Sequence, residues 1–185
     1  MNSRSNLSRR KFLKIAAVGV GSLGIAQGCR SQRAPNLYYF TVNEARLVEA
    51  ISDQIIPPDE WPGGRESGVM NFIDKQLAGP YRRYRSDYRT GLRAIDEECM
   101  RRYGKSFESL SWDRQTSFLI EMQSGSLNHG SWSGGFGRRF FELLRSHSLQ
   151  GYYGSPRHGG NKNFVSYKML GLDYPQLRGR NRRSS

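Results

Sequence analysis

Residues 140–172, FFELLRSHSLQGYYGSPRHGGNKNFVSYKMLGL, hold the densest combination of aromatic residues and glycines in the chain. Their first part predicts a helix, because apolar residues and one histidine recur at the spacing of a single helix face. The residues on this face are Phe136, Phe140, Leu143, Leu144 and His147. We expect the face to be buried, and we expect Gly151 and Gly154 to end the helix.

A turn and a second helix are expected in the rest of this segment. Residues 155–160, SPRHGG, cannot continue a helix, so the chain must turn there. Asn161 is a good helix cap, and residues 164–170 predict a short helix that stops at Gly171. The segment therefore predicts a helix, a tight glycine loop and a second helix.

The glycine loop has the composition of an anion-binding site. An arginine, a histidine and the amides at the start of the next helix would together favour a carboxylate, a lipid phosphate or the edge of a cofactor. A conformationally demanding connection between two packed helices explains the glycines equally well. The interface candidates in this loop are Arg157, His158, Gly159, Gly160 and Asn161.

Residues 152–171, YYGSPRHGGNKNFVSYKMLG, resemble the C-terminal signature of the gluconate 2-dehydrogenase subunit 3 family. Three segments further upstream are similar to the N-terminal pattern of that family. They are IIP at 55–57, WPGG at 61–64 and GVMNFID at 68–74. The resemblance covers residues 41–175 and omits only the N-terminal leader and the last residues.

This resemblance implies a small subunit of a membrane-associated dehydrogenase. In that family the small subunit accompanies a large FAD-bearing dehydrogenase that acts on a sugar or sugar acid, and usually a cytochrome c subunit as well. The small subunit has no accepted catalytic residues. The resemblance thus implies no cofactor in this chain, FAD in the large subunit and haem c in a third subunit.

The N-terminus resembles a twin-arginine export signal. Residues 8–14, SRRKFLK, match the consensus at every defined position, through Arg9, Arg10, Phe12, Leu13 and Lys14. The apolar run at 15–26 is diluted by glycines and is shorter than the about 20 residues that a membrane span needs. We therefore expect residues 1–29 to be a leader that directs export of the protein to the periplasm by the twin-arginine translocase.

Cys29, at the end of this leader, is a candidate lipidation site. Small residues precede it, as in a lipoprotein-processing site, although Ala26 and Gln27 depart from the usual pattern. Ordinary cleavage close by is the alternative. Acylation of Cys29 would anchor the protein to a membrane surface, and residues 30–40 predict a polar tether.

The chain is strongly basic, with a formal net charge of +13. Five of its 29 basic residues lie in the leader, so a mature chain would carry 24 basic and 16 acidic residues, a net charge of +8. This surplus favours contact with an acidic partner subunit, anionic lipid headgroups or nucleic acid. Export from the cytoplasm argues against nucleic acid.

Helical periodicity without strand-like alternation predicts an all-α fold. We expect a single compact domain of five or six helices at residues 41–178, since 185 residues are too few for two good cores. Thr41 and Glu44 form a capping box for the first helix, which Pro57 should end. Residues 179–185 form a basic tail with too few apolar groups to fold.

Three further helices are expected between the first helix and the glycine loop. The second has inward residues Val69, Phe72, Ile73 and Leu77, and the fourth follows a cap at Ser111 with Trp112, Gln115, Phe118, Leu119 and Met122. The third, at 81–103, has an inward face of Tyr84, Tyr88, Ile95 and Cys99, and an outward face of Arg82, Arg85, Arg89 and Arg93.

The inward and outward faces of the third helix lead to two predictions. Cys99 is expected to be a buried free thiol, with a disulfide to Cys29 as the alternative in an oxidising compartment. The arginine face is expected to be solvated, or to contact an acidic partner or lipid headgroups.

The loop at 58–65, PDEWPGGR, is stiffened by prolines and bent by glycines. Loops of this kind often carry function, so Asp59 and Trp61 are interface candidates. The alternative is a plain connection between helices in which Trp61 packs on the core.

The three histidines predict no catalytic, cofactor-binding or metal site. His129 and His158 fall in loops and His147 on a buried helix face, so no pair has the i, i+4 spacing of a helical metal site. His147 is expected to be a core residue whose nitrogens find partners in the adjoining loop.

The leading hypothesis is an exported, non-catalytic small subunit at the periplasmic side of the inner membrane. It would aid the export, assembly or stability of a flavin-bearing partner, because its export signal suits folded cargo while the chain has no dinucleotide fingerprint or haem-attachment motif. Two alternatives remain: a stand-alone periplasmic lipoprotein, and a periplasmic enzyme that uses the His147/His158 region.

Overall fold

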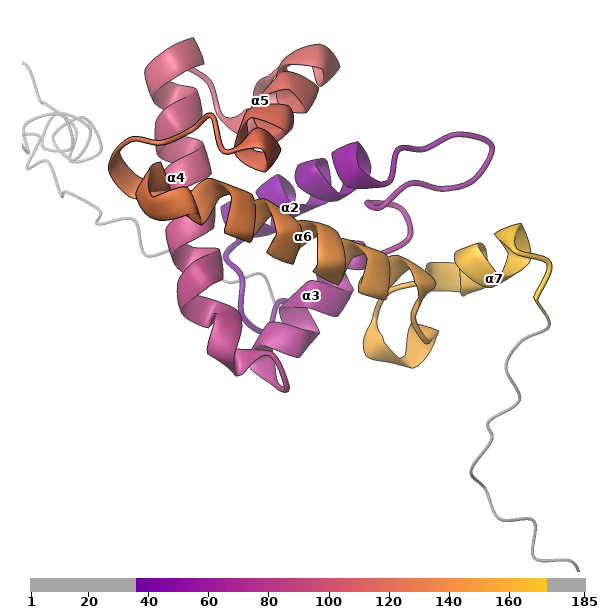
Figure 1. Ribbon diagram of the computed structural model, residues 1–185. Coiled ribbons are helices and arrows are strands. Elements are labelled where there is room, and N and C mark those ends of the chain that lie inside the picture. Colours follow the sequence, from indigo (N-terminus) through magenta and orange to yellow (C-terminus); the bar gives the residue numbers. More distant parts are fainter. Residues whose placement is uncertain (1–35, 173–185) are drawn as a thin grey trace, which may run out of the picture. The chain divides into compact units, whose positions relative to one another are not determined.

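Residues 36–172 are described in the computed structural model, and every regular element among them is helical (Figure 1). The candidate leader, Cys29, the first part of the predicted tether and the tail at 179–185 lie outside the described residues. The predicted all-α fold is therefore confirmed for this part of the chain. No helix within it combines the length and the apolar character that crossing a membrane requires.

Six α-helices, joined by short 3₁₀ turns, make up the described residues. The α-helices are α2 (Val42–Ile55), α3 (Val69–Ala78), α4 (Arg85–Tyr103), α5 (Trp112–Ser124), α6 (Phe136–Tyr153) and α7 (Val165–Met169). The 3₁₀ turns are η1 (Arg82–Tyr84), η2 (Phe107–Ser109), η3 (Gly130–Gly135), η4 (Pro156–His158) and η5 (Lys162–Phe164).

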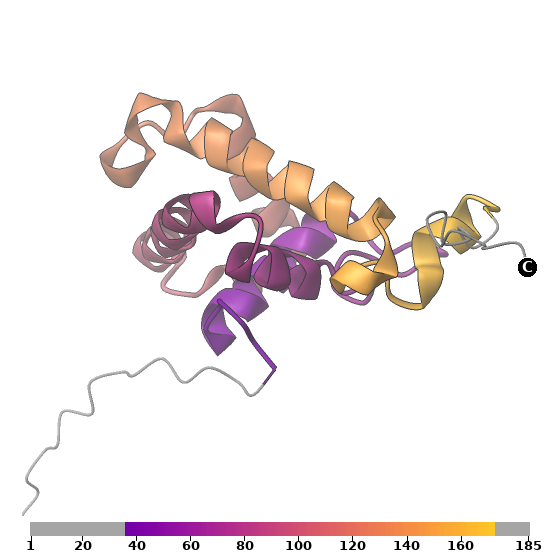
Figure 2. The same ribbon diagram turned by 90° about the horizontal axis from the view of Figure 1, so that it is seen from below.

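Helix α6 is central to the packing, because it contacts α2, α3, α4, α5 and α7. Both ribbon views show it running across the other helices (Figures 1 and 2). Its predicted face is buried at Phe140, Leu144 and His147. The approach to α4 is close, since a Cβ atom on Gly91 would lie 2.2 Å from the Phe140 ring. Burial of a large apolar side chain such as Phe140 contributes roughly 1.5–3 kcal/mol.

The start of α2 confirms the predicted capping box. The hydroxyl of Thr41 accepts a hydrogen bond from the Glu44 amide over 3.2 Å, and the Glu44 carboxylate accepts one from the Thr41 amide over 2.8 Å. The helix ends at Ile55, just before Pro57. Local sequence alone therefore sets both ends of α2.

The end of the predicted tether folds onto the domain. The Asp74 carboxylate on α3 accepts hydrogen bonds from three consecutive amides, those of Tyr38 (2.6 Å), Tyr39 (2.8 Å) and Phe40 (2.8 Å). Asp74, Tyr39 and Phe40 are all buried. Residues 38–40 therefore belong to the domain rather than to a tether, because a buried carboxylate requires donors of this kind.

Helix α4 has the two faces that its sequence predicts, after a 3₁₀ turn that occupies Arg82–Tyr84. Tyr88, Ile95 and Cys99 are fully buried, whereas Tyr84 lies in the 3₁₀ turn and is half-buried. Of the four arginines predicted to face outward, Arg82, Arg89 and Arg93 are exposed and Arg85 is half-buried. Cys99 is a free thiol, and burial raises its pKa to about 12.

Three local details differ from the expectations. Gly151 lies inside α6, because the helix continues to Tyr153 before Gly154 closes it. Ser111 occupies the N-cap position of α5, but its side chain makes no capping hydrogen bond. Trp112 is 47% exposed, since it precedes the buried face of that helix.

Candidate functional site

The glycine loop after α6 folds back against the end of that helix. A Cβ atom on Gly160 would lie 2.1 Å from the carbonyl oxygen of Gly151, so a larger residue would force the backbone to move. A Cβ atom on Gly151 would in turn lie 3.1 Å from the Phe72 ring on α3. Gly159 has a φ of 102°, which disfavours residues with a Cβ atom. The packing therefore accounts for these glycines.

Asn161 ties the end of α6 to the start of α7. Its side-chain amide donates to the carbonyl oxygen of Gly154, and its Oδ1 accepts from the Ser166 amide, both over 2.9 Å. The side chain is completely buried, and its backbone is left-handed with a φ of 45°. Asn161 and the buried Gly160 therefore support the loop from inside, and their role as interface residues stays a prediction.

Arg157 and His158 are the exposed side chains of the loop. The Nε of Arg157 donates a hydrogen bond to the Nε2 of His158 over 3.0 Å. The amides of His158, Gly159 and Lys162, which an anion site would use, are donated to carbonyl oxygens inside the protein. These two side chains can reach a partner, but those three amides offer no anion cradle.

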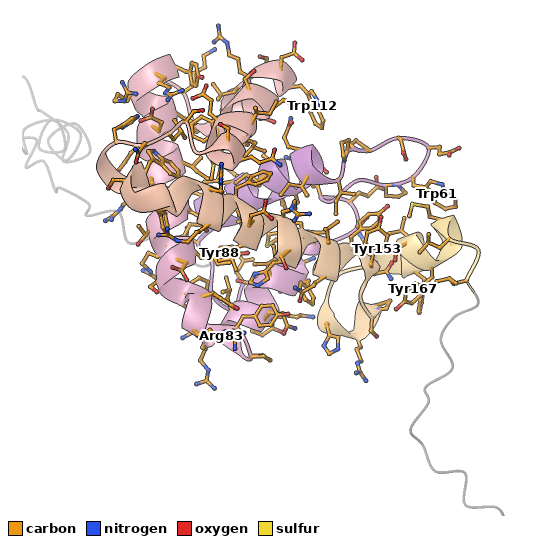
Figure 3. The ribbon with its side chains drawn as sticks, viewed as in Figure 1. Trp61, Arg83, Tyr88, Trp112, Tyr153 and Tyr167 are labelled. Atoms are coloured by element: carbon orange, nitrogen blue, oxygen red, sulfur yellow. The ribbon has the colours of Figure 1, made fainter. Side chains whose placement is uncertain are left out.

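Residues 162–168, which follow the glycine loop, and the connection after α2 form the two walls of a groove of about 260 Å³. A hydrogen bond from the Tyr152 hydroxyl to the Pro62 carbonyl oxygen (3.1 Å) holds the wall that contains Pro62 against the end of α6. In Figure 3 the labelled side chains of Trp61, Tyr153 and Tyr167 gather at this end of the domain. The groove is lined by Trp61, Pro62, Glu66, Lys162, Asn163, Val165 and Lys168.

Asp59 holds the tryptophan in place on its side of the groove. Its carboxylate accepts a hydrogen bond from the Trp61 amide over 2.7 Å, and its own amide donates to the Trp61 carbonyl oxygen over 3.1 Å. Asp59 is exposed, whereas Trp61 is half-buried and packs against the core. Trp61 therefore packs on the core, as the alternative of a plain connection expects, and it also lines the groove.

Exposed apolar side chains continue on the elements that form the groove. We call the groove and these residues together the α7 surface. The exposed residues are Tyr153 (44% exposed), Phe164 (36%), Leu170 (54%) and Leu172 (54%). Large apolar side chains gathered at one end of a domain in this way are typical of an interaction surface.

The turn before α7 is strained. Asn163 and Phe164 have φ values of 57° and 59°, in the left-handed region. This conformation costs roughly 1–2 kcal/mol for a residue with a side chain, and it is rare for a bulky one. The fold nevertheless keeps the Phe164 ring partly exposed, 6.2 Å from the Tyr167 ring. Strain maintained at an exposed aromatic residue supports a binding role for the α7 surface.

The family described as gluconate 2-dehydrogenase subunit 3 matches this chain over residues 42–173. The chain belongs to the gluconate 2-dehydrogenase subunit 3 family. The match contains the complete α7 surface, and it confirms the resemblance that the sequence motifs indicated. Membership in a family of subunits implies partner subunits. No curated protein and no solved structure matches the chain.

In this subunit 3 chain His147 is a core residue, as expected. It is 3% exposed, its Nδ1 lies 3.0 Å from the Tyr88 hydroxyl, and its ring stacks on Tyr81 with centroids 4.5 Å apart. The polar partner thus comes from α4 rather than from the adjoining loop, because α6 turns this face toward α4. Burial, aided by the positive charge of Arg83, lowers the pKa of His147 to about 4, so the ring is neutral near pH 7.

The three histidines of the subunit have separate surroundings. His147 contacts α4 and Tyr81 in the core, His158 contacts Arg157 at the surface, and His129 lies 3.5 Å from Glu98. Within residues 36–172 no group of three His, Cys, Asp or Glu side chains is placed to hold a metal ion. The structure therefore shows no contact between His147 and His158 that would support the alternative of an enzyme site there.

Sequence reasoning missed two buried carboxylates of the subunit, Asp74 and Glu98. Glu98 is 5% exposed, and hydrogen bonds from Arg101 and Arg102 lower its pKa. Arg102 also pairs with Glu121 of α5 over 2.7 Å, which links α4 to α5. Each acid lies on the apolar stripe of its helix, Glu98 three residues after the buried Ile95. An acid at such a position was the signal available in the sequence.

Proposed function

We propose that this chain is a non-catalytic small subunit of a FAD-dependent dehydrogenase complex that oxidises a sugar or sugar acid. It aids the export, assembly or stability of the flavin-bearing large subunit, and the family resemblance implies a cytochrome c subunit with haem c as a third member. The family match over residues 42–173 is the observation that carries this proposal. The α7 surface, which lies within the matched residues, supports it.

The complex is proposed to lie in the periplasm at the inner membrane. The motif around Arg9 and Arg10 supports export through the twin-arginine translocase, which moves folded proteins and therefore suits a chain that accompanies a flavoprotein. Either a lipid on Cys29 or a partner subunit would hold the complex at the membrane. FAD is assigned to the large subunit, and no cofactor is assigned to this chain.

The α7 surface is the proposed contact with the large subunit. Covering its exposed apolar side chains would stabilise the complex by roughly 25 cal/mol for each Å² removed from water. The strained turn at Asn163 and Phe164 is held within the folded domain, so binding would order little further chain. Lys162 and Lys168 line the groove and would meet acidic groups of the partner.

Two sets of variants test this contact during co-expression with the large subunit. Phe164→Ser combined with Leu170→Ser removes exposed apolar side chains, and we expect at least a tenfold loss of co-purified flavoprotein. The matched control is Trp112→Ser with Ile120→Ser on α5, because these residues are 47% and 56% exposed and lie outside the α7 surface. Equal recovery of flavoprotein with both double variants would remove the α7 surface from the account.

Phe164→Gly separates binding from folding. Glycine adopts a φ of 59° without the strain that phenylalanine bears, so this variant should be as stable as the unaltered chain or more stable by up to about 1 kcal/mol. It should still bind the flavoprotein less tightly, because the exposed ring is gone. A large fall in stability would instead show that Phe164 serves the fold.

A further inference from the structure

A second surface of the domain, apart from the α7 surface, is strongly basic. Residues 75–93 contain six basic residues and a single acid, Asp87. One of the six, Arg93, pairs with Glu97 over 3.7 Å. We call the other five the basic face: Lys75, Arg82, Arg83, Arg85 and Arg89. Four of them are exposed and Arg85 is half-buried.

The positive charge of the basic face is held in place without being neutralised. Within residues 36–172 none of its five side chains forms an ion pair, although five other arginines do. Arg85 donates instead to the carbonyl oxygen of Leu77 over 2.7 Å, and Arg82 donates to that of Gly79 over 3.4 Å. The neighbouring Asp74 carboxylate is occupied by three backbone amides.

Aromatic rings also position three of the guanidinium groups. Arg83 lies over the Tyr84 ring at 4.6 Å, and Arg85 and Arg89 lie over the Tyr39 ring at 5.2 Å and 5.7 Å. Such cation–π contacts orient the groups. Arg83 also donates one hydrogen bond to the Tyr84 hydroxyl over 3.0 Å and Arg85 one to Leu77, and a guanidinium group has five N–H donors, so others remain for an outside acceptor. In Figure 3 the labelled Arg83 lies well away from Trp61 and Tyr167, so this face is distinct from the α7 surface.

The basic face lies where the described residues begin. Asn36 and Tyr38 line a pocket of about 500 Å³ together with Lys75, and Tyr38 lines a second one of about 530 Å³ with Arg85 and Arg89. Tyr38 is 58% exposed. Cys29 precedes Asn36 by seven residues, which span at most about 25 Å when fully extended. An anchor at Cys29 would therefore hold this face close to the membrane.

We propose that the basic face binds the surface of a bilayer that contains anionic phospholipids. Its arginines donate charge-assisted hydrogen bonds to lipid phosphates, and Tyr38 lies at the level of the headgroups. Each basic residue close to an anionic membrane raises affinity on the order of fivefold. The inference rests on the proposed membrane location, and it is independent of which dehydrogenase the α7 surface binds.

Vesicle sedimentation of the full chain tests the proposal. Every sample carries the substitution Cys29→Ser, so that acylation contributes nothing to vesicle binding. The vesicles contain equal parts of phosphatidylglycerol and phosphatidylcholine. The triple variant Arg82→Gln, Arg83→Gln and Arg89→Gln should bind on the order of 100-fold more weakly. The matched triple variant Arg46→Gln, Lys105→Gln and Arg114→Gln loses the same charge from exposed positions outside the face, and it should bind within about twofold of the unaltered chain.

Three results would overturn the proposal. The first is equal loss of binding in the two triple variants, which would indicate a response to net charge alone. The second is equal binding of the unaltered chain to vesicles of phosphatidylcholine only, or binding that raised salt does not weaken. The third is unchanged vesicle binding with lost flavoprotein co-purification in the basic-face variant, which would make the face a protein interface. Flavoprotein recovery should otherwise stay unchanged, so this test and that of the α7 surface fail separately.

Discussion

Replacing Asp74 by asparagine tests how the start of the domain is fastened to α3. The change keeps the shape of the side chain but removes its charge and replaces one carboxylate oxygen with an amide group. The carboxylate accepts three hydrogen bonds, from Tyr38 at one oxygen and from Tyr39 and Phe40 at the other. An asparagine can keep the last two and must lose the first, because its amide group cannot accept a hydrogen bond.

The expected loss follows from the strengths of these bonds. A hydrogen bond to a charged group contributes roughly 1.5–3 kcal/mol, and one between neutral groups about 1 kcal/mol. Two bonds to Asp74 weaken by about 1 kcal/mol each, and the third, at the exposed Tyr38, is replaced by a bond to water at a cost of about 1 kcal/mol. The variant should therefore lose about 3 kcal/mol, or about 10 °C in melting temperature for a domain of this size.

Urea unfolding followed by circular dichroism measures this loss on the full chain. We expect a lower midpoint at an unchanged m value, since the compactness of the two states should not change. The control is Asp96→Asn, an exposed residue of α4 for which we expect a change within about 0.5 kcal/mol. If Asp74→Asn also stays within that margin, the three hydrogen bonds do not fasten residues 38–40 to the domain.

Two further predictions concern the glycine loop and the buried histidine. Gly160→Ala should destabilise the chain by about 1–3 kcal/mol, because its Cβ atom would lie 2.1 Å from the Gly151 carbonyl oxygen. The control is Gly104→Ala, where the backbone is strained at a φ of 61° but a Cβ atom would meet open space. Thermal unfolding should show the larger loss of stability for Gly160→Ala. His147 is neutral in the folded chain because its pKa is lowered to about 4, whereas in the unfolded chain it binds a proton near pH 6.5. The free energy of unfolding should therefore fall by about 2 kcal/mol as the pH drops from 7 to 5. His147→Gln should unfold with a correspondingly flatter pH dependence, and identical pH profiles would contradict the prediction.

Features that depend on neighbouring residues were predictable from the sequence. The capping box at Thr41 and Glu44 needs only a spacing of three residues, and it forms as expected. The inward stripes of α3 and α4 follow from helical periodicity, so residues such as Ile73 and Cys99 are buried as predicted. The composition of the glycine loop likewise indicated a turn between two helices.

Features that depend on distant residues were not predictable in the same way. Asp74 receives its donors from residues 34 to 36 positions earlier, and Tyr88 reaches His147 across 59 positions. No local pattern contains either pairing. The left-handed backbone at Phe164 is also absent from sequence signals, because bulky residues rarely adopt it.

The candidate site falls between these two cases. Trp61 and the glycine loop were separate candidates in the sequence. Trp61 lines a groove whose other wall is residues 162–168, directly after the glycine loop, and none of the loop's interface candidates lines it. Asn161 was expected as a cap and does bond to the amide of Ser166, but it is buried and also bonds to Gly154. Composition therefore singled out these segments, while the supporting role of Asn161 inside the loop depends on packing that the sequence does not show.

Affinity purification of the tagged chain from the periplasm, followed by absorption spectroscopy, tests the central claim most directly. The account predicts that a second, flavin-bearing polypeptide is recovered in near-equal amount, with haem bands if a cytochrome joins the complex. It also predicts that the purified chain alone shows neither flavin nor haem absorption. Recovery of the chain without a partner, or a redox cofactor held tightly by the isolated chain, would contradict the claim that it serves as a companion subunit.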